Sequence, residues 1–415
     1  MKYDLVFEGG GAKGMVFVGA LEVFEEEGCQ FDRLLGTSAG AITATFLAAG
    51  YNSQEMRERL SEKENGKPVF AGFLGEPPPF SEEEIQDSAV RALLQRIDLP
   101  LVPEFLEEML DERILEALST NPRLRHIFSF IERGGWYGAE KFLVWLRQKL
   151  DEKHAQLVDE GAIAAGDRPF SEMNLEEYHQ ATGRELTLIG ADTTAERMLV
   201  LNHHTAPQCP VVWATRMSMS VPLLWEEVIW QPEWGSYRGR NISGHAVVDG
   251  GLLSNFPIEL FVSDEKPVTD VMGPNTSDRV LGMLIDESMP VDDAPPAGAL
   301  APLGAGLATA FEFGELRTVQ RLHHLVNTAT MAHDKAVIEA FQEMVVRLPA
   351  RGYGTTEFDM SEERQKALLA AGRREMRRYF DQHPPQTRAV VPFDVPGDPA
   401  VTEVANERAR RILEW

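Results

Sequence analysis

The chain has 415 residues, with 40 Lys and Arg against 65 Asp and Glu, so its formal net charge is −25. This excess of acid argues against a nucleic-acid binder, which usually carries a basic face, and disfavours long-range attraction to anionic membranes. A hydrophobic content of 43% and a charged content of 25% are those of an ordinary soluble globular protein. At roughly 100–200 residues per domain, the length fits one large domain or two moderate ones.

The N-terminal segment MKYDLVFEGGGAKG has neither the apolar core nor the cleavage site of a signal peptide. No uninterrupted apolar stretch reaches about 18 residues, the length that indicates a membrane-spanning helix. The two cysteines, Cys29 and Cys209, are too few for a disulfide framework and are expected to be packed thiols. These features predict a cytoplasmic protein in a reducing environment.

The first fifty residues alternate between short apolar runs and helical patterns. Strands are predicted over residues 3–7 and 31–35. Helices are predicted over residues 15–27 and 39–49, because apolar residues recur there at helical spacing and a glycine follows each pattern. Strands that alternate with helices imply a parallel sheet with helices packed on it.

The middle of the chain is more highly charged. Residues 52–180 show mostly helical patterns and predict a helical insertion or cap on the α/β core. Patterns of the α/β core then return in five segments: residues 185–192, 198–202, 211–220, 246–248 and 280–285.

The remainder of the chain predicts a linker and helices. Residues 286–302 are rich in Pro, Ala, Gly and Asp, which indicates a linker or a mobile loop. From Glu315 to Leu348, apolar residues recur every three to four positions and predict one long helix that covers the sheet, with a partner-binding helix as the alternative. We therefore expect an α/β domain over residues 1–290 and a mainly helical part, residues 291–415, packed on it.

The sequence GTSAG at residues 36–40 has the form G-x-S-x-G and lies after a predicted strand and before a predicted helix. This is the context of a nucleophile elbow, in which a serine hydroxyl projects from the end of a strand. Gly36 and Gly40 allow the strained turn, and the helix N-terminus favours negative charge nearby. Ser38 is therefore a candidate nucleophile, with an ordinary small-residue turn as the alternative.

A glycine-rich segment, GGGAKG at residues 9–14, lies between the first predicted strand and the first predicted helix. Gly9, Gly11 and Gly14 fit the G-x-G-x-x-G fingerprint of dinucleotide-binding proteins, and Asp32 lies about where a ribose-binding acid is expected. That acid should end the second strand, whereas Asp32 opens it, so the carboxylate would lie at the wrong end of the sheet.

The same segment fits an oxyanion-binding loop better. A P-loop is excluded because Lys13 is followed by Gly14 and not by Ser or Thr. Neighbouring parallel strands end at one edge of a sheet, which places the glycine loop beside Ser38. Its exposed backbone amides could stabilise the oxyanion of an acyl-transfer reaction there.

A serine nucleophile needs a base. None of the ten histidines lies in an obvious strand-end turn late in the chain, where a Ser–His–Asp hydrolase places its base. Asp249 directly follows the apolar run at residues 246–248 and precedes Gly250 and Gly251. A partly shielded carboxylate within hydrogen-bond reach of a serine hydroxyl can act as its base; an ordinary Asp-Gly-Gly turn is the alternative.

In this order, GGGAKG, GTSAG and the DGG of residues 249–251 resemble the patatin-like phospholipase family. Four longer segments agree with that family: residues 186–202, 214–230, 249–261 and, as the helical tail of many bacterial members, 358–380. Residues 52–180 show little similarity to it. The resemblance implies a three-layer α/β fold with a mostly parallel central sheet and helices on both faces.

The resemblance also assigns roles. Ser38 corresponds to the nucleophile and Asp249 to the base of a Ser–Asp dyad without histidine. The backbone amides of Gly9, Gly10 and Gly11 correspond to the oxyanion hole.

Further positions complete the three motifs. Lys13 holds the family's Arg/Lys position, where it would orient the loop or attract a lipid phosphate; a solvated lysine at the helix start is the alternative. Glu8 holds a position that is often Asp. The motif glycines are Gly14, Gly36, Gly40, Gly250 and Gly251.

The implied activity is hydrolysis of fatty-acyl esters in phospholipids or other lipids, with no metal or cofactor and with transient contact to a membrane surface. A transacylase and a regulated membrane-degrading effector stay open as alternatives on the same site. An NAD-dependent enzyme and an inactive scaffold are less favoured. Candidates for lipid contact are the apolar segment 297–313 and the insertion with Trp136 and Trp145, whose commoner role is core packing. The oligomeric state is left open.

Overall fold

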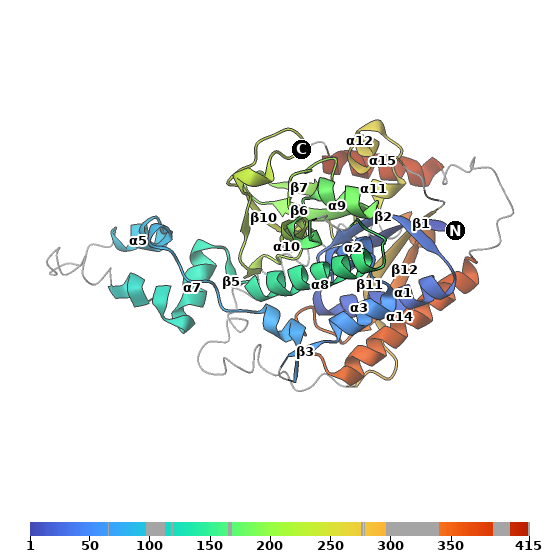
Figure 1. The fold of residues 1–415 in the computed structure, drawn as a ribbon, viewed down its shortest axis with the longest axis horizontal. Helices are drawn as coiled ribbons and strands as arrows, with labels where there is room; N and C mark the ends of the chain where they lie inside the picture. The colour runs from blue at the N-terminus through green and yellow to red at the C-terminus, as the bar shows by residue number, and fades with distance from the viewer. Residues whose placement is uncertain are drawn as a thin grey trace.

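The computed structural model describes residues 1–64, 66–96, 113–117, 119–164, 168–274, 277, 279–295, 340–384 and 399–413. At its centre is an eight-stranded sheet with the order β12-β11-β1-β2-β6-β10-β9, in which β7 also pairs with β6. Helices cover this sheet, as Figure 1 shows. A mostly parallel sheet with the first two strands as neighbours confirms the fold class predicted from the sequence.

Five strands run parallel and form most of the sheet: β1 (Lys2–Phe7), β2 (Gln30–Thr37), β6 (Glu185–Asp192), β11 (Arg279–Pro290) and β12 (Val345–Arg351). Two strands, β7 (Arg197–Leu201) and β10 (Ala246–Asp249), pair antiparallel with β6. The short β9 (Val228–Ile229) pairs antiparallel with β10. The strands predicted from apolar runs are therefore present.

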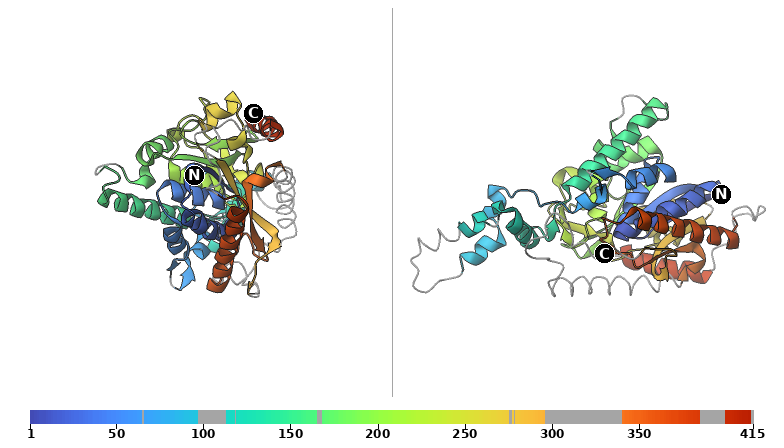
Figure 2. Two further views of the ribbon diagram at one scale, coloured as in Figure 1. Left: turned by 90° about the vertical axis from the view of Figure 1, so that its right-hand side faces the viewer. Right: turned by 90° about the horizontal axis from the view of Figure 1, so that it is seen from below.

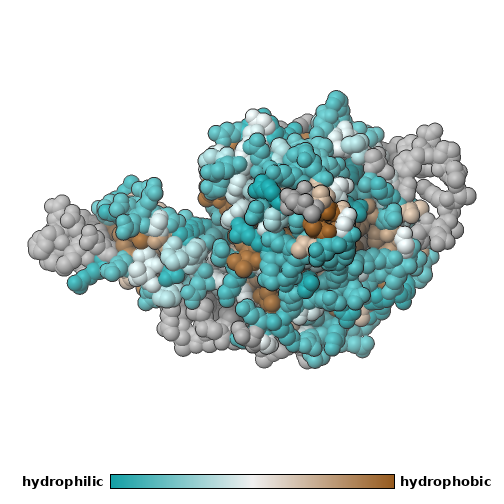
Figure 3. Space-filling model, viewed as in Figure 1, coloured by the Kyte–Doolittle hydropathy of each residue, from teal (hydrophilic) through white to brown (hydrophobic). Residues whose placement is uncertain are grey.

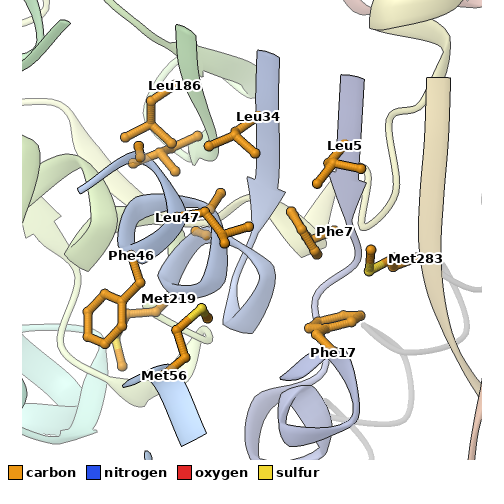
Figure 4. Packing of buried hydrophobic residues seen from close by; sticks show 14 of the residues in the cluster. Leu5, Phe7, Phe17, Leu34, Phe46, Leu47, Met56, Leu186, Met219 and Met283 are labelled. Carbon is orange, nitrogen blue, oxygen red and sulfur yellow. The ribbon is translucent and has the colours of Figure 1, made fainter. Parts of the chain in front are cut away.

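Successive side chains of the central strands point to opposite faces of the sheet, so each face has its own core. Leu5 and Phe7 of β1 belong to the larger cluster, whereas Val6 between them belongs to the smaller one. The larger cluster includes residues of α1 (Met15–Glu26), α2 (Ala39–Ala48), α8 (Glu140–Asp159), α10 (Val211–Ser218) and α14 (Glu362–Gln382); part of it is drawn in Figure 4. The smaller cluster includes residues of α11 (Glu259–Val262), α12 (Lys266–Met272) and α15 (Pro399–Leu413). These two helical layers on one sheet make the three-layer fold.

The C-terminal helix α14 packs directly on α1 through two glycines. A Cβ atom on Gly19 would collide with the backbone of Leu369, and one on Gly372 would collide with the backbone of Val16. The two helices therefore approach more closely than larger side chains would permit. This contact fixes the helical tail that the sequence predicts over residues 358–380 against the first helix of the chain.

Two predictions for the region after residue 285 are wrong where the structure describes it. The linker predicted to begin at Asp286 is still part of β11, which continues to Pro290. The helix predicted over residues 315–348 lies mostly outside the described residues, but its end, Val345–Leu348, is the start of β12. Burial of five of the seven β12 residues and the parallel pairing of β12 with β11 explain the strand. β12 comes after residue 290, where the α/β domain was predicted to end, but it belongs to the same sheet as β1 and β2.

The predicted insertion at residues 52–180 is mainly helical in its described parts. Its helices are α3 (Ser53–Leu60), α4 (Glu82–Gln86), α5 (Ala89–Leu94), α7 (Pro122–Glu132), α8 and α9 (Leu175–Thr182). It also holds the short strands β3 (Lys63–Glu64), β4 (Lys67–Pro68) and β5 (Gly135–Tyr137), the last paired with β8 (Leu223–Trp225). Helices α5 and α7 pack together and project from the body of the protein in Figures 1 and 2; we call this pair the arm.

Two smaller expectations can be compared with the described residues. Cys29 and Cys209 are free and buried, as predicted for packed thiols. No helix in the described ranges combines the length and the apolar character needed to cross a bilayer.

Candidate active site

Ser38 directly follows β2, and Asp249 is the last residue of β10. The ends of these two strands meet on one side of β6. Thr37, the last residue of β2, pairs with Ile189, and Asp249, the last residue of β10, pairs with Gly190. At both of these β6 residues, β7 occupies the opposite side. The ends of β2 and β10 therefore lie next to each other along the same side of β6. The Asp249 side chain forms a hydrogen bond with the Ser38 side chain.

The turn at Ser38 has the strained backbone of a nucleophile elbow. Ser38 has φ 55° and ψ −120°, immediately before α2, a conformation that costs a non-glycine residue about 1–3 kcal/mol. A Cβ atom on Gly36 would collide with the Gly40 carbonyl, and one on Gly40 with the Phe7 carbonyl. The amide of Ser38 donates to the buried Ser218 hydroxyl oxygen at 3.1 Å. Close backbone packing and this hydrogen bond hold the strained turn.

Asp249 is almost completely buried, with 4% of its surface exposed. Burial raises the pKa of its carboxyl to about 7, although hydrogen bonds from the Ser38 side chain and the Gly251 amide act in the opposite direction. The Gly251 amide donates to Asp249 Oδ1 at 2.8 Å, so the residue also forms the Asp-Gly-Gly turn that the sequence offered as an alternative. A carboxyl that titrates near neutrality is suited to accepting and returning a proton.

Arg216 in α10 holds the backbone of Asp249 through Ser220. Its guanidinium is buried and donates to the Ser220 hydroxyl oxygen and, at 2.9 Å, to the Glu226 carbonyl. Burial lowers the pKa of Arg216 to about 10. The Ser220 carbonyl in turn accepts the Asp249 amide at 2.9 Å. Nothing in the sequence marked Arg216 or Ser220 as positioning residues, because their contacts form only in the folded chain.

The glycine loop lies against Ser38. A Cβ atom on Gly9 would lie 2.9 Å from the Cβ of Ser38 and would collide with the Asn255 side chain. Gly11 has a positive φ of 55°, and a Cβ there would also collide with the Thr355 carbonyl. Both positions therefore require glycine, and the loop passes close to the serine as predicted.

Three backbone amides of this segment donate within the protein: Gly9 to the Asn255 carbonyl at 3.3 Å, Ala12 to the Thr355 carbonyl at 2.9 Å and Lys13 to the Gly10 carbonyl at 3.2 Å. Within the described part of the chain, the amides of Gly10 and Gly11 have no such acceptor. Of the three amides predicted for an oxyanion hole, these two are free to bind a ligand.

Glu8 and Asn255 fix the position of the loop. The buried Glu8 carboxylate accepts the Ile285 amide at 2.6 Å and the Asn255 side-chain amide at 3.2 Å. The same Asn255 amide group donates to the Gly9 carbonyl at 2.9 Å. Asn255 lies in the segment 249–261, whose similarity to the family did not indicate a role for this side chain; the structure shows that it joins the DGG segment to the glycine loop.

Lys13 is not the solvated helix-start lysine that was one alternative. Its side chain is 4% exposed and its ammonium group pairs with Glu287 of β11. A buried lysine needs such a partner, because desolvating an unpaired charge is costly. The contact favours the predicted role of orienting the loop.

The remaining motif glycines allow other close approaches around the site. A Cβ atom on Gly14 would lie 2.9 Å from the Cβ of Ala39, on Gly250 2.5 Å from Ile189, and on Gly251 2.8 Å from Asn255 Oδ1. Asp32, the acid of the dinucleotide alternative, lies in β2 far from its C-terminal end and pairs with Lys2 at 2.8 Å.

Comparison with known proteins agrees with these motifs. A family model described as patatin-like phospholipase matches residues 5–262. This chain belongs to the patatin-like phospholipase family. The patatin-like chain is also 28% identical over 393 residues to the uncharacterized protein YqhO of Bacillus subtilis, a match that covers 92% of this chain and 99% of YqhO.

Two solved structures are more distant matches of this patatin-like protein. VipD from Legionella pneumophila matches with 15% identity and a TM-score of 0.42, over 92% of this chain and 67% of VipD. The type III effector ExoU of Pseudomonas aeruginosa, in its heterodimeric complex with SpcU, matches with 16% identity and a TM-score of 0.37. That match covers 92% of this chain and 51% of the ExoU chain, so the patatin-like chain corresponds to about half of ExoU.

The raised pKa of Asp249 has a consequence for stability. The folded protein binds this proton more tightly than the unfolded chain, in which the carboxyl has its ordinary pKa of 3.8. The resulting stabilisation is fully present below pH 3.8 and is lost as the pH rises through about 7. We therefore expect Asp249→Asn, which removes the charge, to raise Tm relative to wild type increasingly from pH 5 to pH 8, by a free energy on the order of a few kcal/mol at pH 8.

Thermal unfolding followed by circular dichroism at several pH values measures this difference. Asp270→Asn, at an exposed carboxylate paired with Lys266, is the matched control and should give a difference in Tm that does not widen with pH. A difference for Asp249→Asn that stays constant over this range would contradict the raised pKa.

Proposed function

We propose that this chain is a lipid acyl hydrolase of the phospholipase A type, with Ser38 as nucleophile and Asp249 as base. Membership of the patatin-like phospholipase family supports the general class. The observation that carries the residue assignment is the side-chain hydrogen bond between a serine in a strained elbow and a buried carboxyl whose pKa is about 7. The two amides of Gly10 and Gly11 beside them supply donors for an oxyanion.

In the proposed reaction, Asp249 accepts the proton of the Ser38 hydroxyl as its oxygen attacks the ester carbonyl. The amides of Gly10 and Gly11 stabilise the negative charge that develops on the carbonyl oxygen. Asp249 then gives the proton to the departing alcohol, which leaves the acyl group on Ser38. In the second half, Asp249 accepts a proton from water, the resulting hydroxide attacks the acyl ester, and the proton returns to Ser38.

The same site can transfer the acyl group to another acceptor. If an alcohol replaces water in the second half, the enzyme is a transacylase, and the residues and the first half of the reaction are unchanged. A regulated effector that degrades membranes would also use the same chemistry. We place hydrolysis first because water needs no additional binding site.

Substitution of either side chain tests the assignment. Ser38→Ala removes the attacking oxygen and Asp249→Ala removes the proton acceptor, so each should reduce kcat for ester hydrolysis by about 10⁴-fold or more, without additive loss in the double variant. The measurement is release of fatty acid from mixed phospholipid vesicles, with mass spectrometry of the products to separate hydrolysis from transfer.

Ser243→Ala is the matched serine control, since this side chain lies outside the site, and it should retain wild-type activity. Circular dichroism establishes that each variant is folded. Undiminished hydrolysis by folded Asp249→Ala would eliminate the dyad. A wild-type protein that releases no acyl group from any vesicle would favour the inactive scaffold.

We further infer that the arm contacts the lipid surface. Leu93 of α5 is 61% exposed and Ile131 of α7 is 51% exposed, and Figure 3 shows apolar surface on the arm beside an otherwise mostly hydrophilic face. Exposed apolar residues can insert into a bilayer despite the unfavourable net charge. Trp145, a candidate from the sequence, instead packs in the core, and the candidate segment 297–313 lies outside the described residues.

Charge substitutions on the arm separate lipid access from chemistry. The double variant Leu93→Glu/Ile131→Glu should lower hydrolysis of vesicle phospholipid by about tenfold or more, because burial of each apolar side chain contributes about 1.5–3 kcal/mol. Hydrolysis of a short-chain, water-soluble p-nitrophenyl ester should not change. Val144→Glu, at a 54% exposed residue of α8 outside the arm, is the control. Equal loss in the control, or undiminished vesicle activity in the double variant, would show that the arm is not the contact.

A further inference from the structure

A second cluster of chemically capable side chains lies away from Ser38, where three segments meet. His179 comes from α9, Glu185 opens β6, and His203 and His204 occupy the turn that follows β7. No sequence motif joins these residues, and from the sequence no metal-ligand cluster was expected. The fold brings one potential ligand atom each of His179, Glu185 and His203 within 4.8 Å of one another, the only such group among the residues that the structure describes.

The distances from the histidine nitrogens to the two carboxylate oxygens of Glu185 are close to the ligand–ligand distances around a bound metal ion. His203 Nδ1 lies 3.4 Å from Glu185 Oε2, and His179 Nε2 lies 3.8 Å from Glu185 Oε1. Zinc–nitrogen and zinc–oxygen bonds of about 2.0–2.2 Å in a tetrahedral site place neighbouring ligand atoms about 3.4 Å apart. His204 Nε2, 3.8 Å from Glu185 Oε2, is near enough to complete a fourth position.

A hydrogen bond fixes the ring of His179. His179 Nδ1 lies 3.0 Å from the Arg184 carbonyl. A carbonyl can only accept, so Nδ1 carries the proton and the lone pair is on Nε2, which faces Glu185. A metal-ligating histidine commonly donates its other N–H to a backbone carbonyl in this way.

His203 supplies an independent indication. Its Nδ1 is inaccessible to solvent, and within the described part of the chain it has no hydrogen bond, although Glu185 is within ion-pair distance. The turn that carries it is built around Asn202, whose side-chain oxygen accepts the amides of His204 at 3.0 Å and Thr205 at 3.1 Å. A buried nitrogen aimed at a carboxylate from a fixed turn lacks a partner that a metal ion would provide.

We propose that His179, Glu185 and His203 bind one divalent transition-metal ion of the zinc class, with His204 or water as the fourth ligand. Imidazole nitrogens with one carboxylate oxygen suit Zn²⁺, Co²⁺ and Ni²⁺, whereas Ca²⁺ and Mg²⁺ prefer all-oxygen sites. The rings of His179 and His203 lie face to face in parallel planes, with their centroids 3.9 Å apart, so one ring must tilt on binding before both lone pairs can reach the same ion. The widest separation in the cluster must also contract.

The site would have a structural role. Glu185 precedes Gly190, the β6 partner of Asp249, by five positions, so at about 3.3 Å per residue the cluster lies about 17 Å along the strand from the proposed catalytic residues. A metal ion there would join α9, the beginning of β6 and the turn after β7. We therefore expect the ion to raise thermal stability and to leave ester hydrolysis at low temperature unchanged.

Calorimetric titration of the chelator-treated full-length protein with Zn²⁺ tests the proposal. We expect one ion per chain, an increase in Tm, and, with Co²⁺ in place of Zn²⁺, the visible absorption of a tetrahedral cobalt site. His203→Ala should weaken Zn²⁺ binding by about 100-fold or more, since losing even an outer-shell partner of a ligand costs about 10–100-fold. Glu185→Gln, which keeps the shape of the side chain, should weaken it as well.

His383→Ala, at the end of α14, is the matched control and should bind Zn²⁺ as wild type does. Circular dichroism establishes folding, and Glu185→Gln carries the test if His203→Ala does not fold. Absence of stoichiometric Zn²⁺ binding, or equal affinity in wild type, His203→Ala and Glu185→Gln, would overturn the proposal. Neither outcome depends on whether Ser38 and Asp249 hydrolyse lipids.

Discussion

The pairing of β6 with the ends of two oppositely directed strands is the constraint on which the candidate active site depends. β2 brings Ser38 from one direction and β10 brings Asp249 from the other. Thr37, which precedes Ser38, and Asp249 pair with consecutive residues of β6, Ile189 and Gly190. A shift of either strand by one residue would separate the two side chains and turn them to other faces. Helices cover both faces of the sheet and bury the side chains that fix this register. For this reason two short strand ends can hold the two residues in position.

Two features at this point of the sheet lower the stability of the folded protein. Ser38 has a backbone conformation that non-glycine residues rarely adopt, and Asp249 is a carboxyl removed from water. Close-packed glycines and a hydrogen bond to Ser218 hold the first, and the Gly251 amide and the Ser38 side chain compensate the second only in part. Because the effect of burial exceeds that of the hydrogen bonds, the pKa of Asp249 is raised to about 7. The burial that destabilises the charged carboxyl therefore also suits it to proton transfer.

Local patterns in the sequence predicted the elements with local causes. Apolar runs predicted β1, β2, β6 and β10, and apolar residues at helical spacing predicted α1 and α2. Glycine motifs at the ends of strands indicated the candidate site residues. What the sequence could not provide were contacts between distant segments, such as Lys13 with Glu287 or Asn255 with the glycine loop. The same limit concealed the cluster at His179, because its members come from three elements. β12 was missed because the apolar residues at its start continue the helical spacing of the apolar residues that precede them in the sequence.

The rate at which a fluorophosphonate labels Ser38, measured as a function of pH, is the most direct test of whether Asp249 is the base for Ser38, because labelling needs only the nucleophile and its base. If Asp249 is the base, the labelling rate of wild type should rise with pH with an apparent pKa of about 7, the pKa of Asp249. Folded Asp249→Asn should be labelled far more slowly, and without that dependence. An identical pH profile in the two proteins would contradict the assignment of Asp249 as the base.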